Sequence, residues 1–180
     1  TLEYKDLGFH KPIMLAGGIG SIKEVQIKKG VPKAGDVVIV LGGPAMLIGL
    51  GGGSASSTKK TNDNADLDFA SVQRSNPEMQ RRAQQVLDKF NERSSKNPIT
   101  FIHDVGAGGI SNAIPELAKD TNLGVEINLE NIDSADQTMS PMELWCNESQ
   151  ERYVFTIPKK KLRALEDICR KERCPFSIAG

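Results

Sequence analysis

Several kinds of residue are scarce in this sequence, and each shortage excludes a class of protein. Only three cysteines occur, Cys146, Cys169 and Cys174, and their irregular spacing fits neither a disulfide framework nor a zinc site. No apolar run reaches the roughly 18 residues that a membrane span needs. The 23 basic and 23 acidic residues cancel to a formal charge of zero, unlike the basic balance of a general nucleic-acid binder. We therefore expect a cytoplasmic protein in a reducing compartment, with neither a membrane nor a nucleic acid as partner.

The length of the chain bounds its domain organisation. Its 180 residues correspond to about one domain and are enough to bury a core. The chain begins without Met and stops within a strand-like run at residues 174–180. We therefore expect a single domain over residues 1–180 that has been excised from a longer, multidomain polypeptide.

Strand-like and helix-like segments alternate along the chain. The clearest strand lies within residues 35–43, where a β-branched run between glycines is apolar on both faces, so this strand should be central in a sheet. Other strands are expected at residues 11–16, 99–102, 125–129, 153–157 and 176–179. Helices are expected from Asn76-Pro77, over 110–117, from a capping box at Ser140, and over 159–173. The pattern predicts a layered α/β (α+β) domain in which a mixed sheet is packed with helices.

The first candidate for a binding site is the glycine-rich stretch at residues 49–57. Gly51, Gly52 and Gly53 would let backbone N–H groups approach an anion, and the Ser54 hydroxyl adds a donor. The stretch has no GKS or GKT, and a polar segment rather than a helix follows it, so it matches neither a Walker loop nor a dinucleotide-binding turn. A phosphate-binding loop and a flexible loop or tight turn both remain open.

A second candidate is Asp104, which follows a strand and precedes the turn Gly106-Ala107-Gly108-Gly109. Ligands of α/β sheets bind beyond the carboxyl ends of strands. A carboxylate there suits Mg²⁺, and the start of the next helix suits a phosphate. His103 should face the opposite side of the strand, so Asp104 is the preferred site residue. The alternative is that Asp104 caps the helix or stabilises the turn.

A third candidate is the polar run in WCNESQERYVF at residues 145–155. Glu148, Ser149 and Gln150 stand just before a strand, and their side chains can bind hydroxyl, amide and phosphate groups. Gln73 lies before the helix at Asn76 and has similar hydrogen-bonding capacity. The alternatives are a charged, solvated loop for residues 148–152 and a simple polar loop position for Gln73.

Five segments together resemble a known family. They are KPIMLAGGIG, VIVLGGPAMLIGLGGGSASS, DLDFASVQRSNPEMQRR, FIHDVGAGGISNAIPEL and MSPMELWCNESQERY, and they occur in this order over essentially the whole chain. They resemble phosphoribosylformylglycinamidine synthase in its large, single-chain form. The resemblance implies the C-terminal subdomain of the first aminoimidazole ribonucleotide synthetase-like half, with the fold of that synthetase's C-terminal domain.

The resemblance also implies a function. The family is an ATP-dependent carbon–nitrogen ligase coupled to a glutamine amidotransferase, and it converts formylglycinamide ribonucleotide to its amidine in purine biosynthesis. By resemblance, Gln73, Glu148, Ser149 and Gln150 would bind this ribonucleotide, and Asp104 would bind Mg²⁺ with ATP. Smaller members often have Gly-Asp-Pro where Ser75-Asn76-Pro77 stands here. Because this difference begins two residues after Gln73, it affects how Gln73 is placed against the ligand.

Some catalytic parts of the family have no counterpart in these 180 residues. Other domains of the parent chain would supply them, so the isolated piece is expected to be inactive. Two alternatives remain: a mainly structural half-domain that holds an auxiliary nucleotide, and another member of the superfamily, such as a selenophosphate synthetase.

Overall fold

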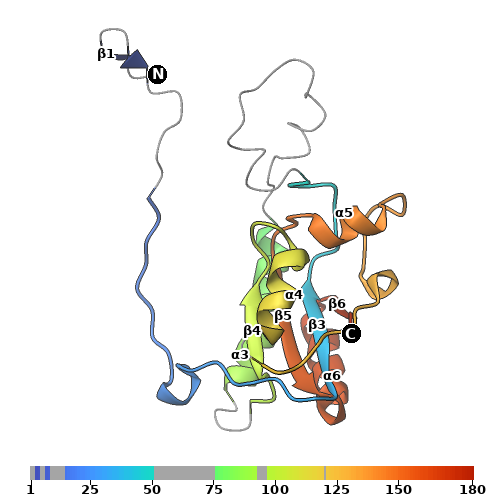
Figure 1. The fold of residues 1–180 in the computed structure, drawn as a ribbon. Helices are drawn as coiled ribbons and strands as arrows, with labels where there is room; N and C mark the ends of the chain where they lie inside the picture. The colour runs from blue at the N-terminus through green and yellow to red at the C-terminus, as the bar shows by residue number, and fades with distance from the viewer. Residues whose placement is uncertain (1–2, 5–6, 9–14, 51–75, 93–96, 120) are drawn as a thin grey trace.

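The computed structural model describes residues 3–4, 7–8, 15–50, 76–92, 97–119 and 121–180 (Figure 1). Two short strands, β1 (Glu3–Tyr4) and β2 (Leu7–Gly8), pair antiparallel with each other. A 3₁₀ turn, η1 (Glu24–Gln26), precedes the main sheet. The strand expected at residues 11–16 falls mostly outside the described residues, and residues 15–16 are not in a strand.

One four-stranded sheet organises the fold. It contains β3 (Asp36–Gly42), β4 (Phe101–Asp104), β5 (Arg152–Pro158) and β6 (Phe176–Ile178) in the order β4-β5-β3-β6. Because β3 pairs with β5 on one side and β6 on the other, its predicted central position is confirmed. All three pairings are antiparallel, so the layered α/β class is confirmed while the sheet itself is antiparallel rather than mixed.

Helices α3 (Pro77–Asn91) and α6 (Leu162–Glu172) cover one face of the sheet. As predicted, α3 begins after Asn76, whose Oδ1 accepts a hydrogen bond from Met79 N at 3.1 Å. The 3₁₀ turn η5 (Lys159–Lys161) leads directly into α6. The apolar faces of both helices pack on alternate residues of β3 and β5, giving a core of Ile39, Leu41, Ala83, Val86, Leu87, Phe90, Phe155, Ile157, Leu165, Ile168, Cys169 and Cys174.

Helix α4 (Ile110–Ala118) packs on the opposite face and makes a second core. This core uses the other set of alternating strand residues, so β3 and β5 are buried on both faces, as the continuous apolar run of β3 predicts. Helix α5 (Pro141–Cys146) begins with the predicted capping box, in which Ser140 Oγ accepts from Glu143 N at 3.3 Å and Glu143 Oε2 accepts from Ser140 N at 2.7 Å.

The prediction of a strand at residues 125–129 is wrong. Residues 125–128 lie outside the sheet, and a 3₁₀ turn, η4 (Leu129–Asn131), follows them. Asn128 N donates to Ala179 O just beyond β6, while the Asn128 side chain accepts from Glu130 N and caps the turn. The bond to Ala179 lies beyond the end of the three-residue edge strand β6, so this segment does not extend the ladder of the sheet.

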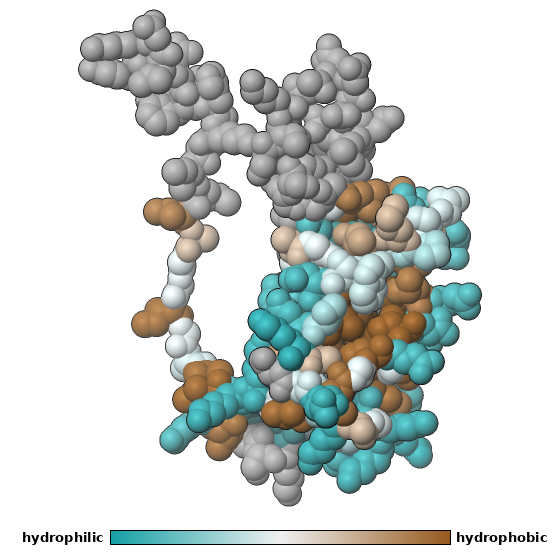
Figure 2. Space-filling model, in the orientation of Figure 1, coloured by the Kyte–Doolittle hydropathy of each residue, from teal (hydrophilic) through white to brown (hydrophobic). Residues whose placement is uncertain are grey.

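Apolar side chains are exposed along the segment that precedes β3. Figure 2 shows brown residues spaced along this extended stretch, and Leu15, Ile19, Ile22, Val25, Ile27 and Val31 are all exposed by more than half. In the described part of the chain, no helix has the length and apolar character to span a membrane.

Candidate functional site

Three turns meet at one edge of the sheet because β5 runs antiparallel between β3 and β4. The register places Gly42 at the end of β3 opposite Arg152, and Asp104 at the end of β4 opposite Tyr153. The chain leaving β3 leads to Gly49, the chain leaving β4 enters the turn at residues 106–109, and residues 147–152, here called the polar turn, lead into β5. The topology therefore brings the candidate segments around Gly49, Asp104 and Glu148 to the same edge.

Glu148 connects the two glycine-rich turns. Its Oε1 accepts a hydrogen bond from Gly108 N at 2.8 Å, and its own N–H donates to Ile48 O at 2.8 Å. Gly49 has a φ of +66°, and a Cβ there would lie 2.5 Å from Glu148 Cβ. Glycine at this position thus allows the backbone to pack directly against the Glu148 side chain. Glu148 is buried, and Oε2 is its oxygen without a hydrogen-bond partner among the described residues.

Ser149 is fully buried, and its hydroxyl forms hydrogen bonds with neighbouring residues. Its hydroxyl accepts from Met46 N at 2.9 Å and donates to Asn147 Oδ1 at 2.7 Å. Asn147, also fully buried, donates its Nδ2 to Glu143 O and Leu144 O at 2.8 and 2.9 Å. These bonds tie the polar turn both to the end of α5 and to the segment that follows β3.

Gln150 lies nearer the surface than its two predecessors and is half-buried. Its Nε2 donates to Glu148 O at 3.1 Å, which orients the amide. Within the described residues the amide oxygen accepts no hydrogen bond. Of the three predicted substrate-binding residues in the polar turn, Gln150 is the one that is not fully buried, so it presents the most accessible polar group.

The sequence indicates Arg152 only as part of a charged loop, yet in the structure it is the most buried cation at this edge of the sheet. Only 2% of its surface is exposed, and burial lowers the pKa of its guanidinium to about 10. Nη2 donates to Asn147 Oδ1 at 2.7 Å and Nε donates to Ser149 O at 3.2 Å. Nη1 has no partner among the described residues. Glu151, at a φ of +58°, instead accepts from Asn76 N at 3.0 Å.

Asp104 is the exposed carboxylate of the site, with 75% of its side chain accessible. The preceding His103 does not face the opposite side as predicted. Its Nδ1 lies 3.5 Å from Asp104 Oδ1, and its Nε2 lies 2.8 Å from Glu116 Oε2 on α4. A Cβ at Gly106 would lie 3.7 Å from Asp104 Oδ2, so this carboxylate stands over the start of the glycine-rich turn. No group of three or more potential metal ligands occurs in the described part of the chain. An exposed carboxylate still suits Mg²⁺, which keeps several waters and uses one or two carboxylates beside phosphate oxygens.

The remaining predicted residues, Gln73, Gly51, Gly52, Gly53 and Ser54, lie outside the described residues. Two cavities are lined by described residues. One, of about 790 Å³, lies between residues 129–144 and 166–177, and the other, of about 1320 Å³, lies between residues 21–30 and α3 with β4. Neither is lined by Asp104 or by the polar turn.

Asn147 and Arg152 are the members of this arrangement that the sequence did not single out. Asn147 follows the last residue of α5, where an amide is suited to binding the free carbonyls of a helix end. Arg152 is the first residue of a strand buried on both faces, so its inward direction follows from the register of β5. Both signals depend on knowing where α5 ends and β5 begins.

Comparisons with known proteins agree with this fold. The family described as AIR synthase related protein, C-terminal domain, matches residues 33–180. The structure of PurL from Thermotoga maritima complexed with FGAR superposes with a TM-score of 0.71 at 24% sequence identity, over 87% of this chain and 25% of that one. The same protein complexed with ATP gives a TM-score of 0.65 at 21% identity, over 87% and 23%.

A more distant match shows how widely the fold is used. Thiamine-monophosphate kinase from Stenotrophomonas maltophilia K279a gives a TM-score of 0.53 at 11% identity, covering 84% of this chain and 48% of that one. At these identities the likeness is one of fold. The chain spans about a quarter of the length of the PurL chains it matches.

Proposed function

The chain belongs to the family of AIR synthase-related C-terminal domains, and from this premise we propose that it is the ligand-binding domain of a phosphoribosylformylglycinamidine synthase. The observation that carries the proposal is the polar turn itself. Glu148 lies against Gly49 and accepts from Gly108, so the NESQER segment is attached to both glycine-rich turns at one sheet edge. The fold matches that of PurL, which has been solved with FGAR and with ATP.

On the substrate side, Gln150 would contact formylglycinamide ribonucleotide through its free amide oxygen. Glu148 would contribute Oε2, while its Oε1 holds the turn at Gly108. Ser149 would act mainly by fixing the backbone, because its hydroxyl already binds Met46 and Asn147. Gln73 would add an amide from the segment before α3. Such residues orient the reacting groups, which is a large part of catalysis in phosphoryl transfer.

On the nucleotide side, Asp104 would hold Mg²⁺, and Gly51, Gly52, Gly53 and Ser54 would bind phosphate. The exposure of the Asp104 carboxylate beside the turn at Gly106 fits a hydrated, hard cation. The ion would neutralise phosphate charge in the bound ATP. The described residues would contribute the carboxylate and the neighbouring turn.

In the parent chain, this domain would serve an ATP-dependent carbon–nitrogen ligase of the cytoplasm. ATP would phosphorylate the amide oxygen of the ribonucleotide, and ammonia from a glutamine amidotransferase domain would then displace phosphate. We propose that the 180-residue chain alone is inactive because these other domains supply the remaining catalytic groups. Amidine formation by the purified chain would contradict this part of the proposal.

A second candidate function is a mainly structural half-domain that holds an auxiliary nucleotide. The full burial of Ser149 and Asn147 favours it, because these polar groups satisfy one another. The accessible amide of Gln150 and the exposed carboxylate of Asp104 favour the first candidate. The two functions predict different results for a substitution of Gln150, because only the first predicts weaker binding of the ribonucleotide.

Steady-state kinetics of the complete enzyme carrying Gln150→Ala would separate them. Loss of one neutral hydrogen bond should cost about 0.5–1.5 kcal/mol, which is roughly a 2- to 13-fold rise in KM for the ribonucleotide, with KM for ATP unchanged. Gln84→Ala, at an exposed position on α3, is the matched control and should change neither constant. Unchanged kinetics for Gln150→Ala would favour the structural half-domain.

A further inference from the structure

Arg152 is a buried cation whose hydrogen-bond acceptors are all uncharged. Its guanidinium donates to Ser149 O, Asn147 O and Asn147 Oδ1, and no ion pair is found for it within the described residues. Nη1, also buried, has no acceptor there. Charges removed from water are normally paired with an opposite charge, because neutral acceptors compensate them only in part. A buried positive charge without a carboxylate therefore calls for a reason beyond packing.

The bond from Arg152 to Ser149 O determines which way the next peptide N–H points. The described residues contain no cis peptide bond, so the Gln150 N–H lies on the side of this peptide opposite to the Ser149 carbonyl. Since the carbonyl faces the guanidinium at 3.2 Å, the N–H faces away from it. Among the described residues, the Gln150 N–H donates to no acceptor. The cation polarises the peptide in the sense that strengthens this free donor.

We propose that Arg152 is a positioning residue. It holds the Ser149–Gln150 peptide so that the Gln150 N–H meets an anionic group of the ligand, and its buried charge favours binding of that anion. The inference rests on the proposed function and adds the chemistry of the group recognised, the phosphate monoester of the ribonucleotide. The direct contacts would be made by Gln150. Arg152 would act through the turn and through its field, which water screens weakly at a buried site.

Equilibrium binding to the complete enzyme would test this with Arg152→Met, which removes the charge, and Arg152→Lys, which keeps it. The probes are formylglycinamide ribonucleotide, the corresponding ribonucleoside without phosphate, and ATP. We expect Arg152→Met to lower the preference for ribonucleotide over ribonucleoside by roughly 10-fold or more, as for loss of a charge-assisted interaction, with affinity for ATP little changed. Arg152→Lys should restore most of the preference. Arg82→Met, which alters an arginine of α3, should leave it unchanged.

The other possible results distinguish failure of this inference from failure of the proposed function. Equal losses of affinity for ribonucleotide and ribonucleoside in Arg152→Met would assign Arg152 a purely structural role and overturn the inference, as would an unchanged preference. Failure of the wild-type enzyme to bind the ribonucleotide would instead overturn the proposed function, and the inference with it. Thermal melts check folding, and if Arg152→Met does not fold, Arg152→Gln supplies the neutral side chain for the same comparison.

Discussion

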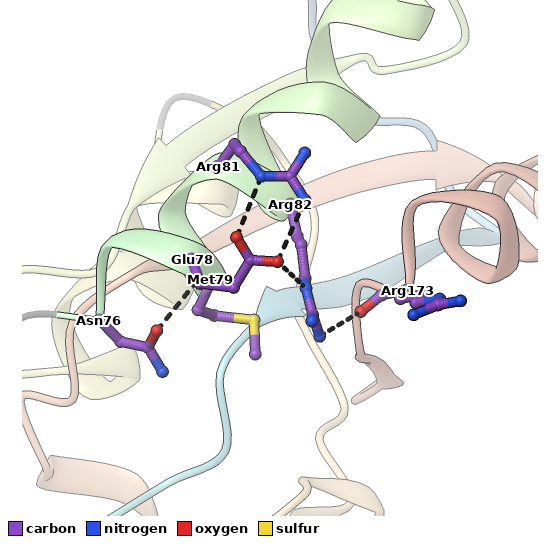
Figure 3. A network of polar contacts seen from close by, with 6 residues as sticks. All are labelled: Asn76, Glu78, Met79, Arg81, Arg82 and Arg173. Carbon is purple, nitrogen blue, oxygen red and sulfur yellow. Dashed lines mark hydrogen bonds and ion pairs between the residues drawn. The ribbon is translucent and has the colours of Figure 1, made fainter.

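Two groups of arginine contacts in this molecule use the same side-chain chemistry in opposite surroundings. On α3, Arg81 and Arg82 both donate to the Glu78 carboxylate, and Arg82 also donates to Arg173 O (Figure 3). The Arg81 and Glu78 side chains there are 57% and 54% exposed. At the sheet edge, Arg152 has no carboxylate in the described residues and is almost fully buried.

The difference shows that charge pairing and structural importance are separate properties. Exposed ion pairs are screened by water and cost side-chain entropy, so they contribute little to stability. The Arg152 contacts are removed from water, and losing one partner leaves buried polar groups unsatisfied. We therefore expect the group without an ion pair to be the more sensitive of the two.

The largest effect should come from Asn147→Ala. Asn147 is fully buried, accepts from Arg152 Nη2 at 2.7 Å, and donates to two carbonyls at the end of α5. Removing its amide leaves a buried guanidinium with fewer acceptors, which should lower the free energy of unfolding by about 3 kcal/mol. Urea unfolding followed by the fluorescence of the single tryptophan, Trp145, would measure it.

A matched substitution separates the effect of burial from the loss of an amide. Asn131 donates to Ile178 O at 3.1 Å from an exposed position, so Asn131→Ala removes a similar hydrogen bond within reach of water. Its free energy of unfolding should fall by less than about 1 kcal/mol. Similar losses for the two variants would remove the distinction between buried and exposed polar contacts.

A smaller effect is expected from Gly109→Ala, which disturbs the same edge through the backbone. Gly109 has a φ of +64°, and a Cβ there would lie 2.1 Å from Asn147 O. The backbone conformation, with positive φ and a ψ of −150°, and the clash should together cost about 2 kcal/mol or somewhat more, again measured by urea unfolding. Gly124→Ala is the control, because a Cβ at Gly124 meets nothing within 4 Å. A neutral Gly109→Ala would mean that the polar turn can move away without loss.

Much of the fold follows from local signals in the sequence. The apolar run of β3 indicated a strand buried on both faces, and Asn76 and Ser140 marked the starts of α3 and α5 correctly. The failure at residues 125–129 has a tertiary cause, since alternating residues form a strand only where a partner offers a ladder. The antiparallel order of the sheet likewise depends on which strands meet, and alternation along the chain carries no information about that.

The candidate site was predictable in its position but not in the division of its roles. The sequence placed Glu148, Ser149 and Gln150 before a strand, and the structure shows β5 beginning at Arg152. Which of these side chains are buried depends on contacts with residues about 40 to 103 positions away, such as Gly108 and Met46. Arg152 and Asn147 resembled ordinary polar loop residues for the same reason.

The smallest effect should come from Glu78→Gln in the exposed network. Hydrogen bonds from Arg81 and then Arg82 lower the pKa of the Glu78 carboxyl to about 2. Because the folded pKa lies below the usual value of 4.5, the stabilisation is fully present above pH 4.5 and is lost as the pH falls from there toward 2. The melting temperatures of wild type and Glu78→Gln should therefore differ slightly at pH 7 and converge across this window. Added salt should also reduce the difference at pH 7, since both partners are exposed. If Glu78→Gln lowered stability at pH 7 as much as Asn147→Ala does, the buried network would not be the more sensitive of the two.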